Sequence, residues 1–259
     1  MKKYFLIAII SILVSSCKKK EGCMDPTASN YNSEASSDNG DCTYSPIKNL
    51  NIHFTQTING NPLNINEMIY TNHSNENYSV QTLRYLISDI TLQAEDGTNT
   101  FLYDVHFIDI STDSTLTLKI PEIVNRNYIS LSFTMGLDPI RNITNLFLNE
   151  NFFPSFAWPD FLGGGYHYMQ LEGDFNTVFN GYATHTGATN GIDFSFNKTF
   201  PITINRTNNI RDITINMEIT NWYQNPELLN FTTNGIMGDI ISQEILKANG
   251  IEDVFSVVN

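Results

Sequence analysis

Residues 158–174 read WPDFLGGGYHYMQLEGD, and we interpret the rest of the chain around this stretch. Its run of glycines, Gly163–Gly165, permits backbone angles and close approaches that a side chain would block. The residues that follow predict a β-strand, in which successive side chains point to opposite faces. We expect one face to carry His167, Met169 and Leu171, and the other to carry Tyr166, Tyr168, Gln170 and Glu172. The stretch thus predicts a histidine held on a stiff strand behind a glycine hinge.

Short strands of this kind recur along most of the chain. Period-two alternation of apolar and polar residues is typical of half-buried strands, and turns rich in Gly, Asn and Asp separate them. The alternation predicts strands at 50–55, 63–65, 78–94, 101–110, 116–120, 128–137, 165–172, 192–196, 200–205 and 210–220, the third of them bent near Ser88–Asp89. This pattern favours an all-β fold, a single antiparallel β-sandwich domain.

A short C-terminal helix is predicted over residues 239–248. Ile240, Ile241, Ile245 and Leu246 form one apolar stripe at helical spacing, and Asn249–Gly250 would end the helix. We find no linker and no internal repeat in this part of the chain. We therefore assign residues 46–259 to one β-sandwich domain, which is long enough to bury a substantial core.

Residues 1–16 have the features of a bacterial lipoprotein signal peptide. A positive segment at Lys2 and Lys3 precedes an apolar segment at 4–14, which is too short to span a bilayer permanently. The small residues Ser15–Ser16 before Cys17 resemble the lipobox, in which the thiol of the cysteine carries diacylglycerol. We expect a lipid anchor in the bacterial cell envelope, at the outer membrane, on its periplasmic or its surface face. An ordinary signal peptide with a chance cysteine is the alternative.

We place a spacer at residues 17–45. If Cys17 carries lipid, Cys23 and Cys42 remain as a pair, which in an exported protein is expected to form a disulfide. The residues between them are loop-formers and resemble a short cysteine-bounded module common in exported Bacteroidota proteins. Among them, Asp38, Asn39 and Asp41 could bind calcium through oxygen ligands or could form a solvated turn.

Composition and motifs narrow the classes of function. The chain has 14 Lys and Arg residues against 27 Asp and Glu residues, a formal charge of -13, and such a surface repels nucleic acid and anionic lipid. High aromatic content with few charges suits a β-rich exported domain. The chain has no G-x-S-x-G, no phosphate-binding glycine loop, no H-E-x-x-H and no C-x-x-C. We therefore expect a protein that is not an enzyme and does not bind nucleic acid.

The histidines are the remaining candidates for chemistry. His53, His106 and His167 fall in predicted strands, which can hold metal ligands rigidly, and His185 falls in a predicted loop at Thr184–Gly187. His53 lies on a polar face and His106 on an apolar one, so they could meet only at a sandwich edge, a bend or a bulge. If they do not meet, His167 with His185 is the alternative pair. Each of them could instead be a packed or hydrogen-bonded histidine that binds nothing.

Residues 51–255 contain, in this order, the stretches NIHFTQTINGNPL, YSVQTLRYLISDITL, YDVHFIDI, MGLDPIRN, GGGYHYMQLEG, THTG, NWYQNP and NGIEDVF. Together these stretches resemble the MbnP-like family of exported copper-binding proteins. The resemblance implies a β-sandwich lipoprotein or periplasmic protein, often encoded beside a di-haem peroxidase of the MauG type. It further implies copper bound through histidine nitrogens, in some members with a tryptophan that is oxidised to kynurenine.

The resemblance also implies which residues bind the metal. The His53 and His106 stretches match histidine-bearing strands of copper-binding members, and the His167 and His185 stretches match a subset of the family. Imidazole suits copper, and Met169 could add a soft sulfur for Cu(I). We therefore expect one copper ion, held by a subset of these residues.

Of the two tryptophans, Trp158 is the better candidate for oxidation, because it adjoins the glycine hinge. Trp222 follows a predicted strand, and neither tryptophan adjoins His53 in the sequence. The expected function is a copper carrier or sensor that a di-haem peroxidase modifies. The alternative is a surface module that binds glycans or proteins through exposed aromatic residues.

Overall fold

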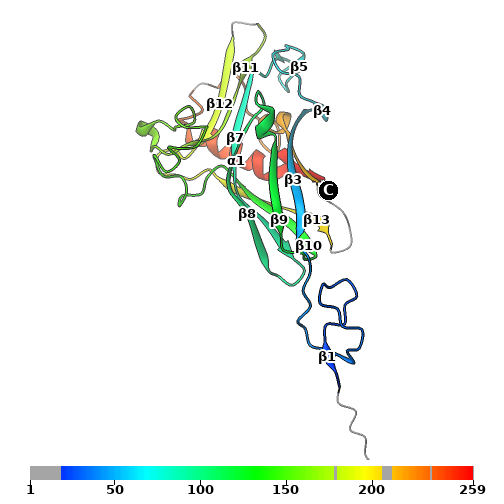
Figure 1. The fold of residues 1–259 in the computed structure, drawn as a ribbon. Helices are drawn as coiled ribbons and strands as arrows, with labels where there is room; N and C mark the ends of the chain where they lie inside the picture. Colours follow the sequence, from blue (N-terminus) through cyan, green and yellow to red (C-terminus); the bar gives the residue numbers. More distant parts are fainter. Residues whose placement is uncertain (1–18, 178–179, 206–211, 234, 259) are drawn as a thin grey trace, which may run out of the picture. The chain divides into compact units, whose positions relative to one another are not determined.

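The computed structural model of the chain describes residues 19–177, 180–205, 212–233 and 235–258. The predicted signal peptide and the lipidation site at Cys17 lie outside these residues. The chain divides into two compact units, Met1–Ser45 and Pro46–Asn259 (Figure 1). Within the described ranges, no helix is long and apolar enough to cross a membrane.

The first unit contains a disulfide between Cys23 and Cys42, which confirms the predicted pairing. The same unit has a short parallel pair of strands, β1 (Glu21–Gly22) and β2 (Ser37–Asp38). Cys23 is buried although the unit is small. The disulfide therefore supplies much of the interior that so short a segment could not build from apolar residues alone.

The acidic loop of the first unit is closed by its own side chains. Asp38 accepts a hydrogen bond from the backbone N–H of Gly40, and Asn39 accepts one from the backbone N–H of Asp41, at 3.1 Å each. Asn39 also donates from its side chain to the Asp41 carboxylate. Such contacts are typical of Asx turns. Calcium binding by this loop stays a prediction.

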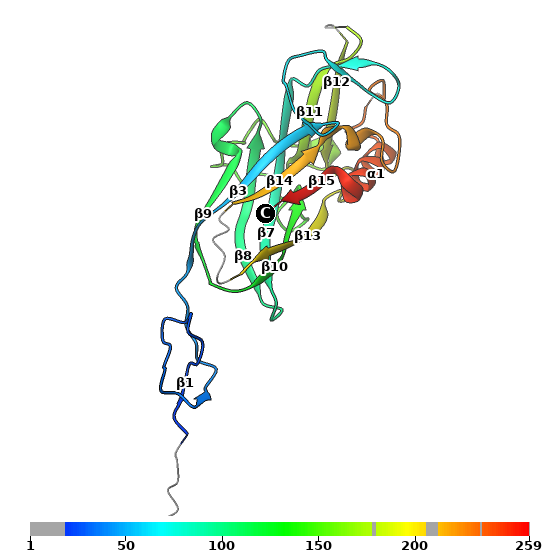
Figure 2. The same ribbon diagram turned by 90° about the vertical axis from the view of Figure 1, so that its right-hand side faces the viewer.

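The second unit is a sandwich of two β-sheets (Figures 1 and 2). The six-stranded sheet has the order β12-β11-β7-β10-β13, with β8 also paired to β7. Its strands are β7 (Thr82–Ala94), β8 (Asn99–Asp109), β10 (Tyr128–Met135), β11 (His167–Asp174), β12 (Gly181–Gly187) and β13 (Phe196–Ile204). The five-stranded sheet has the order β15-β14-β3-β4, with β9 also paired to β3. Its strands are β3 (Ile47–Ile58), β4 (Asn61–Pro62), β9 (Thr117–Ile123), β14 (Asp212–Glu218) and β15 (Phe255–Val258).

The sheets confirm the predicted all-β sandwich. Their strand pairs are antiparallel, with one parallel exception between β3 and β14. A separate hairpin joins β5 (Tyr70–Thr71) to β6 (Asn77–Tyr78). The helical elements are η1 (Asp113–Thr115), η2 (Asp160–Leu162), η3 (Ile219–Tyr223), α1 (Ile240–Asn249) and a π-helical turn, η4 (Gly250–Val254).

The main core lies between the two sheets, as the alternation in β3 predicts. Leu50, Ile52 and Phe54 are buried, whereas Asn51 and His53 between them are half-buried on the outer face. Buried residues of both sheets form one continuous apolar cluster. Removal of this apolar surface from water is the main term that stabilises the sandwich.

A second apolar cluster covers the outer face of the six-stranded sheet. Leu86 of β7 packs there with Phe152 and Phe156, which belong to the long segment between β10 and β11. Ile240 of α1 packs against the same cluster, and Figure 2 shows α1 beside β12. The six-stranded sheet is therefore buried on both faces, which allows a site on its outer face to be shielded from water.

Several predicted boundaries in the second half of the chain are wrong, among them the end of the strand 210–220, because Ile219 already begins η3. Thr184–Gly187 belongs to strand β12 rather than to a loop, and residues 192–195 are not a strand. β12 lacks an apolar alternation because two of its buried positions are threonines, Thr184 and Thr186. The Thr184 hydroxyl is hydrogen-bonded to the hydroxyl of Tyr223 at 2.9 Å, which makes its burial tolerable.

A β-bulge interrupts the alternation in β11. His167 pairs with Gly187 of β12, and Met169 pairs with the adjacent Thr186, so Tyr168 is an extra residue on β11. The bulge places His167 on the outer face with Glu172, while Met169 enters the core between the sheets. The prediction that His167 and Met169 share one face is wrong. Period-two alternation assumes a regular strand, and the inserted residue shifts His167 to the other face.

Helix α1 is present at the predicted place, but its buried face differs from the predicted stripe. Asp239 caps the helix by accepting a hydrogen bond from the Ser242 N–H at 3.0 Å. Ile241 of the predicted stripe is 66% exposed, whereas the polar Gln243 is fully buried. Gln243 makes several hydrogen bonds in the interior, and apolar periodicity alone could not identify it as a buried residue.

Candidate metal centres

The four candidate histidines fall into two pairs, with His106 and His167 on opposite faces of the six-stranded sheet and His53 on the outer face of the five-stranded sheet. His106 on β8 stacks on Phe54 of β3, with 5.0 Å between ring centres, and so faces the core between the sheets. His167 on β11 lies 5.5 Å from Phe156, in the cluster on the outer face. His53 lines the same groove as His106, and the ring of His185 contacts the ring of His167. Because the sheet separates the pairs, the four histidines cannot bind one common ion.

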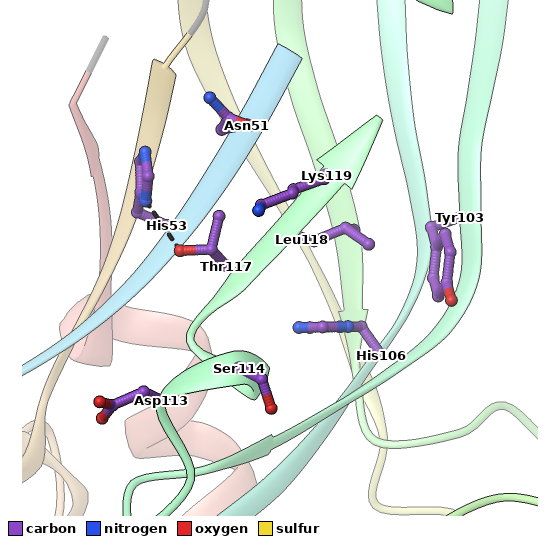
Figure 3. A pocket seen from close by; sticks show the side chains of 9 residues that line it. All are labelled: Asn51, His53, Tyr103, His106, Asp113, Ser114, Thr117, Leu118 and Lys119. Carbon is purple, nitrogen blue, oxygen red and sulfur yellow. Dashed lines mark hydrogen bonds between the residues drawn. The ribbon is translucent and has the colours of Figure 1, made fainter. Parts of the chain in front are cut away.

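The first pair lines an open groove of about 740 Å³ between the edge strands β8 and β9 (Figure 3). Both histidines reach this sandwich edge, but they approach it from different faces of the five-stranded sheet. In Figure 3 the two imidazoles extend from β3 and β8 on either side of β9. The residues that line the groove are Asn51, His53, Tyr103, His106, Asp113, Ser114, Thr117, Leu118 and Lys119.

His53 is held at both ring nitrogens. Its Nε2 lies 2.9 Å from Oδ1 of Asp212, and its Nδ1 lies 3.0 Å from Oγ1 of Thr117. A carboxylate only accepts, so Nε2 carries the proton of the neutral ring and Nδ1 accepts from the threonine hydroxyl. The bonds from His53 and Asn51 hold the pKa of Asp212 below its usual value. The imidazole is thus oriented by a carboxylate, and its Nδ1 lone pair faces Thr117.

His106 is held at one nitrogen and by aromatic contacts. Its Nε2 donates to the backbone carbonyl of Thr115 at 2.8 Å, which leaves the lone pair on Nδ1. Its ring also packs edge-on against Tyr103, with 6.0 Å between centres. Burial lowers the pKa of His106, although the bond to Thr115 acts in the opposite direction. His106 is therefore neutral at pH 7, as a metal ligand must be.

The second pair consists of His167 and His185, whose ring centres lie 5.1 Å apart at an angle of 78°. His167 is only 5% exposed, and its Nδ1 lies 3.2 Å from the backbone carbonyl of Phe156. Nε2 of His185 lies 2.7 Å from Oε1 of Glu172. Burial, followed by the nearby His185, lowers the pKa of His167 to about 4. The bond from His185 lowers the pKa of Glu172, so the carboxylate is charged at pH 7.

Two residues that the sequence did not identify position the second pair. Gln243 of α1 donates to the backbone carbonyl of His185 at 2.8 Å and accepts from the Gly187 N–H at 3.3 Å. Gly187 is needed because a Cβ there would lie 2.7 Å from the ring of Trp158. Trp158 in turn packs edge-on against His167, with ring centres 4.7 Å apart.

Met169 and the tryptophans lie away from the groove. Met169 is fully buried between the sheets, on the face opposite to His167, so it cannot bind an ion held by His167 and His185. Trp158 and Trp222 are both buried, and only Trp158 contacts a candidate histidine. Trp222 packs instead against Phe196 and Phe255.

Neither pair has a third ligand of the usual kind. In the part of the chain that the structure describes, no group of three or more His, Cys, Asp or Glu side chains is arranged to hold a metal ion. Any ion at these pairs would therefore have two imidazole ligands from the protein, with other ligands from solvent or from groups of another type.

Comparisons with known proteins agree with the fold. The sequence profile of the MbnP family matches residues 47–239, which is most of the chain. Among solved structures, MbnP from Methylosinus trichosporium is similar, with a TM-score of 0.53 and 13% identity over 81% of this chain and 98% of that one. At this identity the structural similarity concerns the fold alone. No curated protein sequence matches the chain.

Proposed function

The chain belongs to the MbnP family, and we propose that it is a copper-binding protein of the bacterial cell envelope that acts as a carrier or sensor. In this proposal the copper ligands are His53 and His106 in the groove at the sandwich edge. The protein would bind copper without catalysing a reaction of its own.

The observation that carries the proposal is the hydrogen bonding of the two imidazoles. Metal-binding histidines usually donate their second ring N–H to a carboxylate or a backbone carbonyl. His53 does so to Asp212 and His106 to the carbonyl of Thr115, so each has its lone pair on Nδ1. Imidazole is a donor that copper binds strongly, ahead of other divalent first-row metals.

Copper binding by this pair would require rearrangement, because His53 lies on the outer face of the five-stranded sheet whereas His106 faces the core between the sheets. Nδ1 of His53 is hydrogen-bonded to the Thr117 hydroxyl, which would have to turn away when a metal binds. A hydroxyl can rotate at small cost, because its proton has no fixed position. The groove is open to solvent, so water could complete the coordination that two histidines leave unfilled.

Copper titration of single variants tests the groove. We expect His53→Ala and His106→Ala each to weaken copper binding at this site strongly, and Asp212→Asn to weaken it by about 10- to 100-fold, the range for a residue that orients a ligand. His73→Ala is the matched control, because His73 bonds to Asn230 and lies outside both pairs. Unchanged affinity in both groove variants would refute the assignment.

We further propose that lipid at Cys17 anchors the protein. The Cys23–Cys42 disulfide is consistent with this, because such bonds persist in oxidising compartments outside the cytosol. Mass spectrometry of protein from its host should find a mature chain that begins at a lipidated Cys17. An unmodified thiol at that position would rule out the anchor.

A di-haem peroxidase is the proposed partner, with Trp158 as the residue that it oxidises. Trp158 contacts His167, whereas Trp222 is enclosed by phenylalanines. Peptide mapping of protein from its host should find a mass change on Trp158, with Trp222 as the internal reference. Two unmodified tryptophans in cells that contain the peroxidase would eliminate this role.

A second candidate function is partner binding by an apolar surface. The segment before β11 exposes several large apolar side chains, with Ile140 at 79% and Phe161 at 83%. Exposed apolar residues that cluster often mark interaction sites. Metal analysis of protein purified from its host distinguishes the two functions, because a copper-free protein from copper-replete cells would favour partner binding.

A further inference from the structure

We propose that His167 and His185 form a second metal site, which is buried, independent of the groove and suited to Cu(I). It would lie on the outer face of the six-stranded sheet, beneath the segment that carries Phe156 and Trp158. The inference does not depend on the function proposed for the groove, because it uses other residues on another face.

The first argument is that two buried nitrogens have no partner. Nε2 of His167 and Nδ1 of His185 are both shielded from solvent, and no residue that the structure describes forms a hydrogen bond with either. Buried polar atoms in proteins nearly always have a partner. Nε1 of Trp158, whose ring contacts His167, is buried without a partner as well, but as a single N–H donor it could satisfy at most one of the two imidazole nitrogens.

The second argument concerns the protons of the two rings. The carbonyl of Phe156 can only accept, so Nδ1 of His167 carries the proton, and the carboxylate of Glu172 fixes the proton of His185 on Nε2. Both unpartnered nitrogens therefore carry lone pairs, and neither can donate to the other. The lowered pKa of His167 agrees with a neutral ring at pH 7. A cation or a proton donor is required to satisfy both.

The third argument is the distance between the rings. Metal–nitrogen bonds to histidine are about 2 Å long, so each ring centre would lie about 3 Å from a bound ion. Ring centres 5.1 Å apart are compatible with one ion that both imidazoles share at a bent angle. The pattern of supporting bonds, one carbonyl and one carboxylate, is the same as in the groove and is typical of metal-binding histidines.

The surroundings favour Cu(I) over a divalent ion. Phe156 and Trp158 flank His167, and the side chain of His185 is only 14% exposed, so little water can reach the site. A structural zinc ion takes four ligands, usually with a net negative contribution from thiolates or carboxylates. Cu(I) carries a single charge and accepts two or three ligands. Two neutral imidazoles in an aromatic pocket suit that charge, and because the ring spacing implies a bent arrangement, a third donor other than a described His, Cys, Asp or Glu side chain would complete the coordination.

A buried water molecule is the competing occupant, since it could donate to both lone pairs. The test therefore starts from mature protein in which His53→Ala and His106→Ala remove both imidazoles of the groove; we call it the groove-free protein. This protein is titrated with Cu(I) against a chromophoric Cu(I) chelator under anaerobic conditions. We expect one equivalent of Cu(I) to be retained, and X-ray absorption should show nitrogen scatterers as its nearest neighbours. No retained Cu(I) would mean that only water occupies the pair, and would overturn the proposal.

Two further variants in the same background assign the ligands. His167→Phe fills the pocket with an apolar ring and removes an unpartnered nitrogen, so the metal-free protein should remain folded while the retained equivalent is lost. His185→Gln should also abolish retention of the Cu(I) equivalent, whereas His73→Ala should leave it unchanged. Cu(I) binding that survives both His167→Phe and His185→Gln would overturn the assignment. If the unsubstituted protein binds copper but loses all of it with His53→Ala and His106→Ala, the groove is supported and this site is refuted.

Discussion

The imidazole of His106 stacks on the ring of Phe54, with their planes 26° apart and their centres 5.0 Å apart. The two residues belong to different sheets, so the contact links a candidate copper ligand directly to the packing of the sandwich. One face of the ring is thereby fixed, and His106 cannot rotate freely in the groove. The affinity of the groove should therefore depend on a residue that does not touch the metal.

Phe54→Leu tests this dependence. The variant retains an apolar side chain but removes an aromatic contact worth about 1 kcal/mol, so we expect unfolding free energy to fall by about that amount. Copper affinity of the groove should fall too, because His106 loses its support. Urea unfolding and copper titration measure the two effects. Phe101→Leu is the control, since Phe101 also lies near this edge but is 54% exposed. Unchanged copper affinity in Phe54→Leu would show that the stacking does not matter for binding.

Gly187→Ala should disturb the buried histidine pair from a distance. The new Cβ would lie 2.7 Å from the ring of Trp158, which packs on His167. We expect a loss of about 1–3 kcal/mol in unfolding free energy, as for other overpacked sites. Cu(I) binding by the groove-free protein should weaken as well.

Gly181→Ala is the matched control for that variant. Gly181 lies on the same strand, and the atom nearest to its Cβ would be 3.7 Å away, an ordinary contact. We expect Gly181→Ala to change neither unfolding free energy nor Cu(I) binding appreciably. Equal effects of the two substitutions would show that the close approach to Trp158 is not the cause.

Glu218 should make stability depend on pH in the acid range. Burial raises the pKa of its carboxyl, but this is outweighed by hydrogen bonds from the backbone N–H groups of Gly60 and Asn59 and from the Thr57 hydroxyl, so the pKa lies below its usual 4.5. A lowered pKa means that the folded state binds the proton less readily than the unfolded state. The stabilisation is therefore complete above about pH 4.5 and is lost as pH falls through the folded pKa.

Glu218→Gln measures this contribution. The amide cannot accept the same charge-assisted bonds at the Asn59–Gly60 turn, so we expect a loss of about 1–3 kcal/mol at pH 7. The difference from the parent protein should shrink as urea unfolding is repeated toward pH 3. Glu244→Gln on the exposed side of α1 is the control. A difference that stays constant from pH 7 to pH 3 would contradict the role of the charge.

Removing the disulfide should affect the first unit alone. Cys23 and Cys42 are 19 residues apart, and closing a loop of this length stabilises a fold by about 3 kcal/mol in the chain-entropy description. With both cysteines changed to serine, residues 19–45 should exchange their amide hydrogens much faster. Thermal unfolding of residues 46–259 should be unchanged, because they have their own core. A lowered Tm for the second unit would show that the two units stabilise each other.

The sequence predicts the orientation of side chains well in those elements whose two faces differ in polarity. β3 has water on one face and the core on the other, so His53 and Phe54 alternate as expected. The Asn59–Gly60 turn and the Asp239 cap are also readable, because specific residue types produce them. The resemblance to the MbnP family added the expectation that His53 and His106 are related, although they lie on strands of different sheets.

The second pair is harder to predict because its geometry depends on an inserted residue. The bulge at Tyr168 turns His167 from the side of Met169 to that of His185. Gln243 supports the pair from a helix position where a polar residue is usually exposed. The unpartnered nitrogens become visible only when the hydrogen bonds of both rings are known. None of these features changes the pattern of apolar residues along the chain.

The parallel pairing of β3 with β14 sets an order of events for a newly made chain. His53 and its carboxylate partner Asp212 are 159 positions apart, and contacts so distant in sequence form late. A chain that leaves a ribosome or a translocation pore N-terminus first exposes β3 long before β14 can join it. Nascent and C-terminally truncated chains would therefore hold His53 without its orienting partner. Strong copper binding at the groove would begin only when nearly the whole domain has emerged, so the metal would be acquired by finished molecules.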